Sequence, residues 1–171
     1  MSYSFTQLNQ MSQEAFVEAL GAVFENTPAI AHQAWNQRPF ANVADLHQKM
    51  VGVVQAMSQD EQLALIRAHP DLGSKAKMAA ASVQEQAGAG LDQLTPEEYE
   101  RFDLLNQTYN QKFGFPFIIA VKHHTKSSIL EAFELRLKNT VSAEMTQSLA
   151  EITKIAQLRL LVQVRELQPE E

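Results

Sequence analysis

Residues 95–121 read TPEEYERFDLLNQTYNQKFGFPFIIAV, and this stretch decides the fold class. Thr95 is a typical helix N-cap, Pro96 suits the first helical position, and Glu98 completes a capping box. Apolar residues then recur at helical spacing until Gly114, which suits the end of a helix. The apolar run after Gly114 is the one extended-looking piece of the chain, and a single short run cannot form a sheet. We therefore predict a long helix followed by a short, extended, buried connector.

Most of the remaining chain also carries the apolar periodicity of helices. No repeat, low-complexity stretch or linker divides its 171 residues, and a chain of this length can bury a sizeable core. We predict an all-α, single-domain helical bundle over residues 1–171. The other main helices are expected at about residues 13–24, 43–57, 58–67, 128–138 and 143–167.

Composition excludes several classes of function. The chain has 14 basic and 20 acidic residues, a net charge of −6, so we expect no nucleic acid and no anionic membrane as partner. It contains no cysteine, which excludes disulfides, thiolate catalysis and cysteine-based metal sites. No secretory signal is visible, and the longest apolar run is too short to span a bilayer. We therefore expect a cytoplasmic protein.

The five histidines do not form a recognisable metal-binding pattern. No HExxH motif occurs, and no two histidines are spaced four residues apart on a predicted helix. His123 and His124 are neighbours, so their side chains point in different directions on most backbones. We interpret them as solvated loop residues and predict no metal. A metal-dependent hydrolase is the weakest of the alternatives.

His69 stands out because it lies where a helix must end, in the segment RAHPDLG over residues 67–73. Pro70 forces His69 out of helical geometry, and Gly73 permits a tight turn. An imidazole held on such a corner has a fixed direction and titrates near neutrality, which suits general acid or base chemistry. The alternative is a plain helix terminator that happens to carry a polar residue.

Two further segments carry polar residues that suit a ligand. Ser82 and Glu85 have the spacing of a capping box; alternatively, together with Gln86, they offer a polar cluster to a ligand from the first turn of a helix. Arg159 lies on the apolar stripe of the last helix, where it either extends to the edge or forms a buried clamp for a carboxylate. Three of these residues, His69, Glu85 and Arg159, together suggest a binding site for a small polar anion.

In these segments and their order, the chain resembles the family of 2-oxo-4-hydroxy-4-carboxy-5-ureidoimidazoline (OHCU) decarboxylases, which form allantoin in the last step of urate degradation. The resemblance spans most of the chain. It rests on residues 67–73, 82–88, 90–91, 105–106, 109, 112–117, 129–130, 136–139 and 155–160. One departure is visible at His123 and His124, where relatives often carry glycine or basic residues.

The resemblance implies the all-α fold of that family and a cofactor-free decarboxylase acting on a small-molecule substrate. His69 matches the catalytic histidine and Glu85 the catalytic glutamate. The substrate-binding positions of the family correspond to Pro70, Ser82, Gln86, Arg159 and the backbone of the stretch from Phe117 to Ile119.

The chemistry of the implied substrate explains why no cofactor is expected. The carbon that loses CO2 also bears a hydroxyl, and its neighbour is doubly bonded to a ring nitrogen. That imine can accept the electrons of the broken bond, so neither pyridoxal phosphate nor a metal is needed. We expect Arg159 to anchor polar oxygens of the substrate, while Glu85 and His69 exchange the protons.

Two predictions concern assembly and alternatives. The last helix is rich in leucine and valine, which favours a homodimer, unless the helix is simply buried. The residues concerned are Leu160, Leu161, Val162, Val164 and Leu167. The main alternative to an enzyme is a non-catalytic helical domain that binds a small ligand, in which the polar residues are caps and edges.

Overall fold

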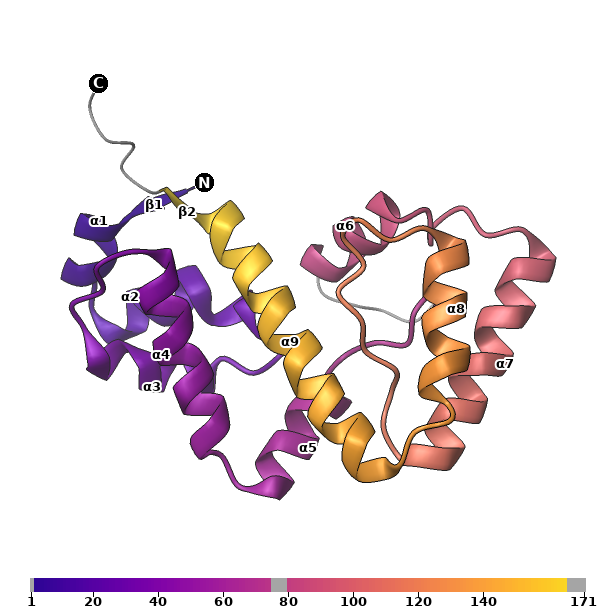
Figure 1. The fold of residues 1–171 in the computed structure, drawn as a ribbon. Coiled ribbons are helices and arrows are strands. Elements are labelled where there is room, and N and C mark those ends of the chain that lie inside the picture. The colour runs from indigo at the N-terminus through magenta and orange to yellow at the C-terminus, as the bar shows by residue number, and fades with distance from the viewer. Residues whose placement is uncertain (1, 75–79, 166–171) are drawn as a thin grey trace. The chain divides into compact units, whose positions relative to one another are not determined.

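The computed structural model describes residues 2–74 and 80–165, and it is helical over most of them (Figure 1). The all-α prediction is confirmed by this architecture. The chain forms two compact units. Unit 1 comprises Met1–Gln62 and Thr153–Glu171, and unit 2 comprises Leu63–Ile152.

Unit 1 is built from short helices around a buried apolar core. Its elements are α1 (Phe5–Gln10), α2 (Gln13–Leu20), η1 (Gly21–Val23), α3 (Ala29–Ala34), η2 (Trp35–Gln37), α4 (Val43–Ala56), the first part of α5 (Gln59–Arg67) and the last part of α9 (Val141–Gln163). Phe16 stacks on Phe40 with ring centroids 5.7 Å apart, and both rings are buried. On α4, the His47 ring lies 2.7 Å from the Thr153 carbonyl oxygen and ties α9 into this unit.

Unit 1 also contains a two-stranded parallel pairing that the sequence analysis did not predict. Strand β1 (Tyr3–Ser4) pairs with β2 (Val164–Arg165). Each strand has two residues, which is too short to show an alternating pattern. The last helix, predicted to reach residue 167, therefore ends at Gln163 and gives way to β2.

Unit 2 is built around the long helix α7 (Pro96–Phe113), as predicted. The Thr95 side chain accepts a hydrogen bond from the Glu98 backbone N–H, and the Glu98 side chain accepts one from the Thr95 backbone N–H, so the capping box is confirmed. Gly114 ends the helix at a φ of +80°, a conformation that glycine adopts without strain. The unit also contains the rest of α5, α6 (Ala80–Gly88), α8 (Lys126–Arg136) and the first part of α9.

The connector between α7 and α8 is the central segment of unit 2. Residues 115–121 are all buried, and residues 116–120 are neither helix nor strand, so the predicted buried connector is confirmed. Phe117 stacks on Phe133 of α8 with ring centroids 3.8 Å apart. Tyr109 of α7 meets the Phe117 ring edge to face at 5.3 Å. Helices α7 and α8 lie side by side in Figure 1, with the connector between their ends.

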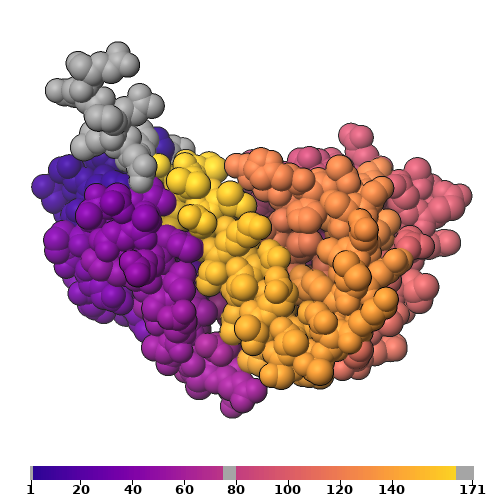
Figure 2. Space-filling view, in the orientation of Figure 1, coloured from indigo at the N-terminus to yellow at the C-terminus, as the bar shows by residue number. Residues whose placement is uncertain are grey.

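Only some of the leucine and valine residues predicted to form a partner surface on the last helix are exposed. Leu160 and Val164 are buried in the core, whereas Leu161 and Val162 are 53% and 75% exposed. Figure 2 shows the C-terminal part of α9 at the molecular surface. Leu167 lies outside the described residues, and the homodimer stays a prediction. Within residues 2–74 and 80–165, no helix is both long and apolar enough to cross a bilayer.

Candidate active site

His69 lies directly after α5, at the corner that Pro70 and Gly73 predict. The backbone N–H of His69 still reaches back to the Ile66 carbonyl at 3.2 Å, but the helix ends at Arg67. The ring Nδ1 lies 2.9 Å from the Leu65 carbonyl oxygen. A carbonyl can only accept, so Nδ1 carries a proton, and in the neutral form of the ring the lone pair is on Nε2. The buried imidazole therefore has a fixed orientation and a defined tautomer.

The turn after His69 is locked onto helix α6. The side-chain Oε1 of Gln86 accepts a hydrogen bond of 3.0 Å from the Gly73 backbone N–H. Gly73 has a φ of +68°, and a Cβ at this position would lie 2.8 Å from Leu94 Cδ1. The positive φ favours glycine here, whereas the Leu94 side chain could shift to relieve the close contact. Gln86 is a predicted substrate-binding residue, and its side chain also holds the turn that follows His69.

Helix α7 holds the same turn from a second direction. Asn106, which is buried, donates a hydrogen bond of 2.8 Å to the Leu72 carbonyl. One turn further along α7, Asn110 donates to a carboxylate oxygen of Asp71 at 3.1 Å. These two contacts were not predicted from the sequence. Together with the Gln86 contact they fix the chain on the C-terminal side of the imidazole.

Helix α6 presents three of the predicted site residues on one face. Ser82, Glu85 and Gln86 occupy positions i, i+3 and i+4, which are neighbours on a helix. Ser82 and Gln86 are buried, and Glu85 is half-buried. The capping-box interpretation of Ser82 is wrong, because the helix already includes Ala80 and Ser82 therefore lies inside it. The Gln86 contact with the turn brings the α6 face and the His69 segment together within unit 2.

The family resemblance predicts that the connector binds the substrate through backbone groups rather than side chains. The side chains of Phe117 and Ile119 are 0% and 6% exposed. The Ile118 carbonyl and the Ala120 N–H are bonded to Arg136 and Glu151. In contrast, neither the N–H nor the carbonyl of Phe117 and Ile119 has a hydrogen-bond partner among the residues that the structure describes. Such groups are rare inside proteins, because an unpaired buried N–H or C=O costs free energy.

Arg159 belongs to unit 1, where it is buried and paired. Its Nη2 lies 3.0 Å from Oε2 of Glu25, and its Nη1 donates longer bonds to the carbonyls of Ala22 and Val23 at 3.3 and 3.4 Å. The guanidinium does clamp a carboxylate, as its position on the apolar stripe suggested, but this carboxylate is the protein's own. The alternative that the Arg159 side chain extends to the edge of the apolar stripe and into solvent is wrong, because the residue is only 7% exposed. Its contact with a substrate stays a prediction.

Glu25 is a residue that the sequence analysis missed. It lies just before Asn26, Thr27 and Pro28, a segment that looks like an ordinary break between helices. Only the long-range pairing with Arg159 explains why a glutamate is 1% exposed there. An acidic residue in a loop carries no local signal that distinguishes a buried ion pair from solvation.

His123 and His124 lie between the connector and α8. His123 is exposed, and the Nδ1 of His124 lies 2.9 Å from the Ser128 hydroxyl at the start of α8. In the part of the chain that the structure describes, no group of three or more histidine, aspartate or glutamate residues is placed to hold a metal ion.

A cavity of about 350 Å³ opens beside His69. It is lined by Arg67, His69, Asp71, Asn110, Gly114, Phe115 and Pro116. Arg67 is fixed there by a bond of 3.1 Å from its Nε to the Gly114 carbonyl. Of the predicted site residues, only His69 borders this cavity. Helix α6 is connected to the His69 segment through the bond between Gln86 and the Gly73 N–H.

This helical fold is represented among solved structures of enzymes. A crystal structure described as (S)-allantoin synthase is similar to 95% of this chain, with a TM-score of 0.77 and 28% sequence identity. The chain covers 54% of that longer chain, about half its length.

The sequence comparisons identify the family. A protein of Halalkalicoccus jeotgali named 2-oxo-4-hydroxy-4-carboxy-5-ureidoimidazoline decarboxylase is 48% identical, over 90% of this chain and 87% of that protein. A protein of Haloferax volcanii with the same name is 43% identical, over 90% and 92% of the two chains. The family described as OHCU decarboxylase matches residues 9–161. The chain belongs to the OHCU decarboxylase family, and the resemblance noted from its motifs is confirmed.

Proposed function

We propose that this protein decarboxylates 2-oxo-4-hydroxy-4-carboxy-5-ureidoimidazoline to (S)-allantoin in urate degradation, without a cofactor. The observation that carries the proposal is the arrangement around His69. A buried imidazole of defined tautomer is locked, through Gly73 and Gln86, to the helix that bears Glu85. Relatives named for this reaction are up to 48% identical to the chain.

The reaction needs little from the protein beyond placement and proton transfer. The bond between the ring carbon and the carboxylate breaks and CO2 leaves. Its electron pair forms a new carbon–carbon double bond, while the electrons of the neighbouring imine move onto the ring nitrogen, which takes up a proton. The hydroxyl then loses its proton to become a carbonyl, and the adjacent carbon gains a proton. Protonation from one face only gives the (S) product.

His69 and Glu85 suit the two proton transfers. In the neutral ring the lone pair of His69 is on Nε2, so this nitrogen can accept the hydroxyl proton or, once protonated, return one. Glu85 is half-buried on the α6 face and provides a second acid–base group. Ser82 and Gln86 on the same face, together with Pro70 beside the imidazole, complete the proposed contacts on this side of the substrate.

The ring of the substrate carries several N–H and C=O groups, which need complementary partners. The backbone groups of Phe117 and Ile119 are suited to this purpose, because no partner within residues 2–74 and 80–165 satisfies them. Arg159 is proposed to bind polar oxygens of the substrate through its planar, two-bond fork. Its pairing with Glu25 supports this role, because the pairing fixes the direction of the guanidinium.

The family match supports two further proposals about organisation. It runs from residue 9 to residue 161, through both compact units, so we propose that the whole chain works as one domain. The predicted homodimer and cytoplasmic location are retained as proposals. The homodimer is supported by the exposed Leu161 and Val162 on α9.

The test is to add the purified protein to freshly generated substrate and follow both its decay and the circular dichroism of the product. We expect decay above the spontaneous rate and a single handedness of allantoin. The alternative of a non-catalytic ligand-binding domain predicts that the spontaneous rate is unchanged and that the product is racemic. That outcome would refute the proposed activity.

A further inference from the structure

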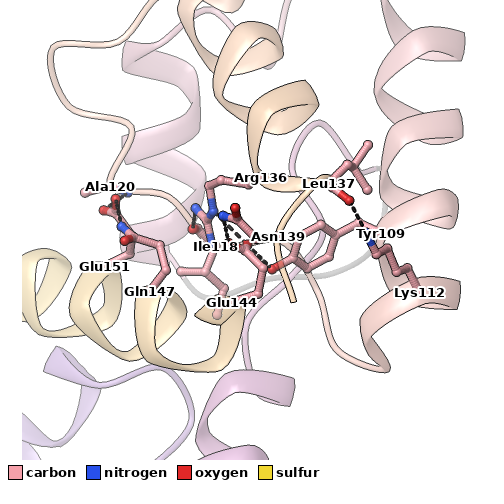
Figure 3. A network of polar contacts seen from close by, with 10 residues as sticks. All are labelled: Tyr109, Lys112, Ile118, Ala120, Arg136, Leu137, Asn139, Glu144, Gln147 and Glu151. Carbon is pink, nitrogen blue, oxygen red and sulfur yellow. Dashed lines mark hydrogen bonds and ion pairs between the residues drawn. The ribbon is translucent and has the colours of Figure 1, made fainter. Parts of the chain in front are cut away.

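Two charged side chains hold the connector from the side of α8 and α9 (Figure 3). From α8, the Nη1 of Arg136 donates to the Ile118 carbonyl at 2.5 Å. From α9, the Oε2 of Glu151 accepts from the Ala120 N–H at 3.1 Å. The two bonded backbone groups belong to residues two apart. The backbone groups of the residues between and before them, Ile119 and Phe117, have no hydrogen-bond partner among the residues that the structure describes.

Arg136 is itself fixed by a buried network. Its Nε donates to Oε1 of Glu144 at 2.8 Å, and Glu144 is fully buried. The Tyr109 hydroxyl donates to the same carboxylate oxygen at 2.6 Å, and Asn139 donates to the other oxygen at 2.9 Å. Burial, reinforced by the bond to Glu144, raises the pKa of Tyr109 above its ordinary value, so the phenol stays a neutral donor. The charge on Arg136 is thus balanced and its position defined.

The same guanidinium also contacts the connector through an aromatic ring. Its Cζ lies 4.3 Å from the centroid of the Phe117 ring, a cation–π contact. The Phe117 ring also stacks on the ring of Phe133. Arg136 therefore contacts the connector at two successive residues, at the ring of Phe117 and at the carbonyl of Ile118.

The direction of the remaining backbone groups follows from chain geometry. In an extended segment, the N–H and C=O groups of successive residues point to opposite sides. Residues 116–121 contain neither helix nor turn. Because Ile118 and Ala120 direct backbone groups toward α8 and α9, those of Phe117 and Ile119 are directed the other way.

From this geometry we infer that Arg136 and Glu151 are positioning residues for the substrate-binding backbone. They form a connector clamp, defined by the Arg136–Ile118 and Glu151–Ala120 contacts, that presents the groups of Phe117 and Ile119 to the substrate ring. The inference rests on the proposed function for the identity of the ligand. It adds a role for the segment around Arg136, a part of the family resemblance that no step of the proposed mechanism uses.

Glu151 offers the sharper test, because it is only half-buried and its replacement leaves the Arg136–Glu144 pair intact. Glu151→Ala removes the acceptor of the Ala120 N–H, whereas Glu151→Gln keeps a side-chain oxygen at the same place. Gln147→Ala is the matched control. Gln147 lies one turn earlier on α9 and bonds to the other oxygen of Glu151 at 3.2 Å.

The first measurement uses the protein without ligand. We expect hydrogen exchange at the Ala120 amide to be about tenfold faster in Glu151→Ala than in wild type, because its bond to a charged acceptor is lost. Exchange in Glu151→Gln and Gln147→Ala should stay near the wild-type rate. Thermal unfolding followed by circular dichroism checks that all three variants are folded. An unchanged amide exchange rate in Glu151→Ala would overturn the clamp.

The second measurement is the affinity for (S)-allantoin by calorimetry. We expect the Kd to rise about tenfold in Glu151→Ala, in line with one lost charge-assisted bond, and less than about twofold in the other two variants. Arg136→Lys, which keeps the charge opposite Glu144, should also weaken binding. Faster exchange with an unchanged Kd would overturn the positioning role. If wild type itself neither binds nor forms allantoin, the proposed function fails, while the exchange result still decides whether the clamp holds the connector.

Discussion

The buried pair between Glu25 and Arg159 leads to a prediction about stability. Replacing Glu25 by Gln removes the negative charge and leaves the Arg159 guanidinium, 7% exposed, with longer bonds to two carbonyl oxygens. Removing one partner of a buried ion pair typically costs about 3–5 kcal/mol, because the other charge remains buried without compensation. Glutamine can still accept one hydrogen bond, so we expect a loss of about 3 kcal/mol in the free energy of unfolding.

The assay can be directed at the unit that contains the pair. Trp35 is the one tryptophan of the chain and lies in η2 of unit 1, so its fluorescence during urea unfolding reports on that unit. A loss of about 3 kcal/mol in a chain of this size corresponds to a fall in Tm of about 6–12 °C.

The control is Glu18→Gln, which removes an exposed carboxylate from α2 in the same unit. Exposed charges usually contribute within about 0.5 kcal/mol. If Glu25→Gln and Glu18→Gln unfolded at the same urea concentration, the ion pair would not stabilise unit 1 and the reasoning would be wrong. A double-mutant cycle with Arg159→Met would then show no coupling.

Three further predictions concern the site and the buried network. His69→Ala and Glu85→Ala should each lower kcat by about a hundredfold or more while remaining folded, since each removes an acid–base group; His123→Ala, the exposed-loop control, should turn over normally, and near-normal turnover of either site variant would end its assignment. Arg159→Lys should weaken the binding of (S)-allantoin, because lysine cannot make the planar two-bond contact; an unchanged calorimetric Kd would contradict this. The raised pKa of Tyr109 means that its contribution to stability is complete below about pH 10 and is lost at higher pH, where the unfolded phenol ionises first. Between pH 8 and 11, the urea concentration at the unfolding midpoint should therefore fall less steeply with rising pH in Tyr109→Phe than in wild type. Equal slopes in the two proteins would contradict this role of Tyr109.

The features that local chemistry determines were predictable from the sequence. Thr95 and Glu98 form their capping box because cap and partner are three residues apart, and Gly114 ends the helix for the same local reason. The corner at His69 follows from Pro70 in the same way. Each of these signals is contained within a few residues, so no knowledge of the rest of the fold is needed.

The features that depend on distant segments were not predictable. The three amides that hold the turn after His69 come from α6 and α7, and the spacing of Asn106 and Asn110 shows nothing of their targets. Ser82 was open to two interpretations because the Ser82–Glu85 spacing fits a cap as well as a helix interior. The partner of Arg159 lies more than a hundred residues away, beyond the reach of any periodicity.

The division of the chain into one continuous and one split unit has a consequence for synthesis on the ribosome. Unit 2 is uninterrupted, so all of its residues have been made once Ile152 has been added. Unit 1 requires segments from both sides of unit 2 in the sequence, since β1 pairs with β2. Domains generally fold as units during translation, with earlier segments first. Here the order is reversed: the opening sixty residues must wait, incompletely covered, until the closing segment emerges, and a chaperone would meet the N-terminal part rather than the segment carrying His69.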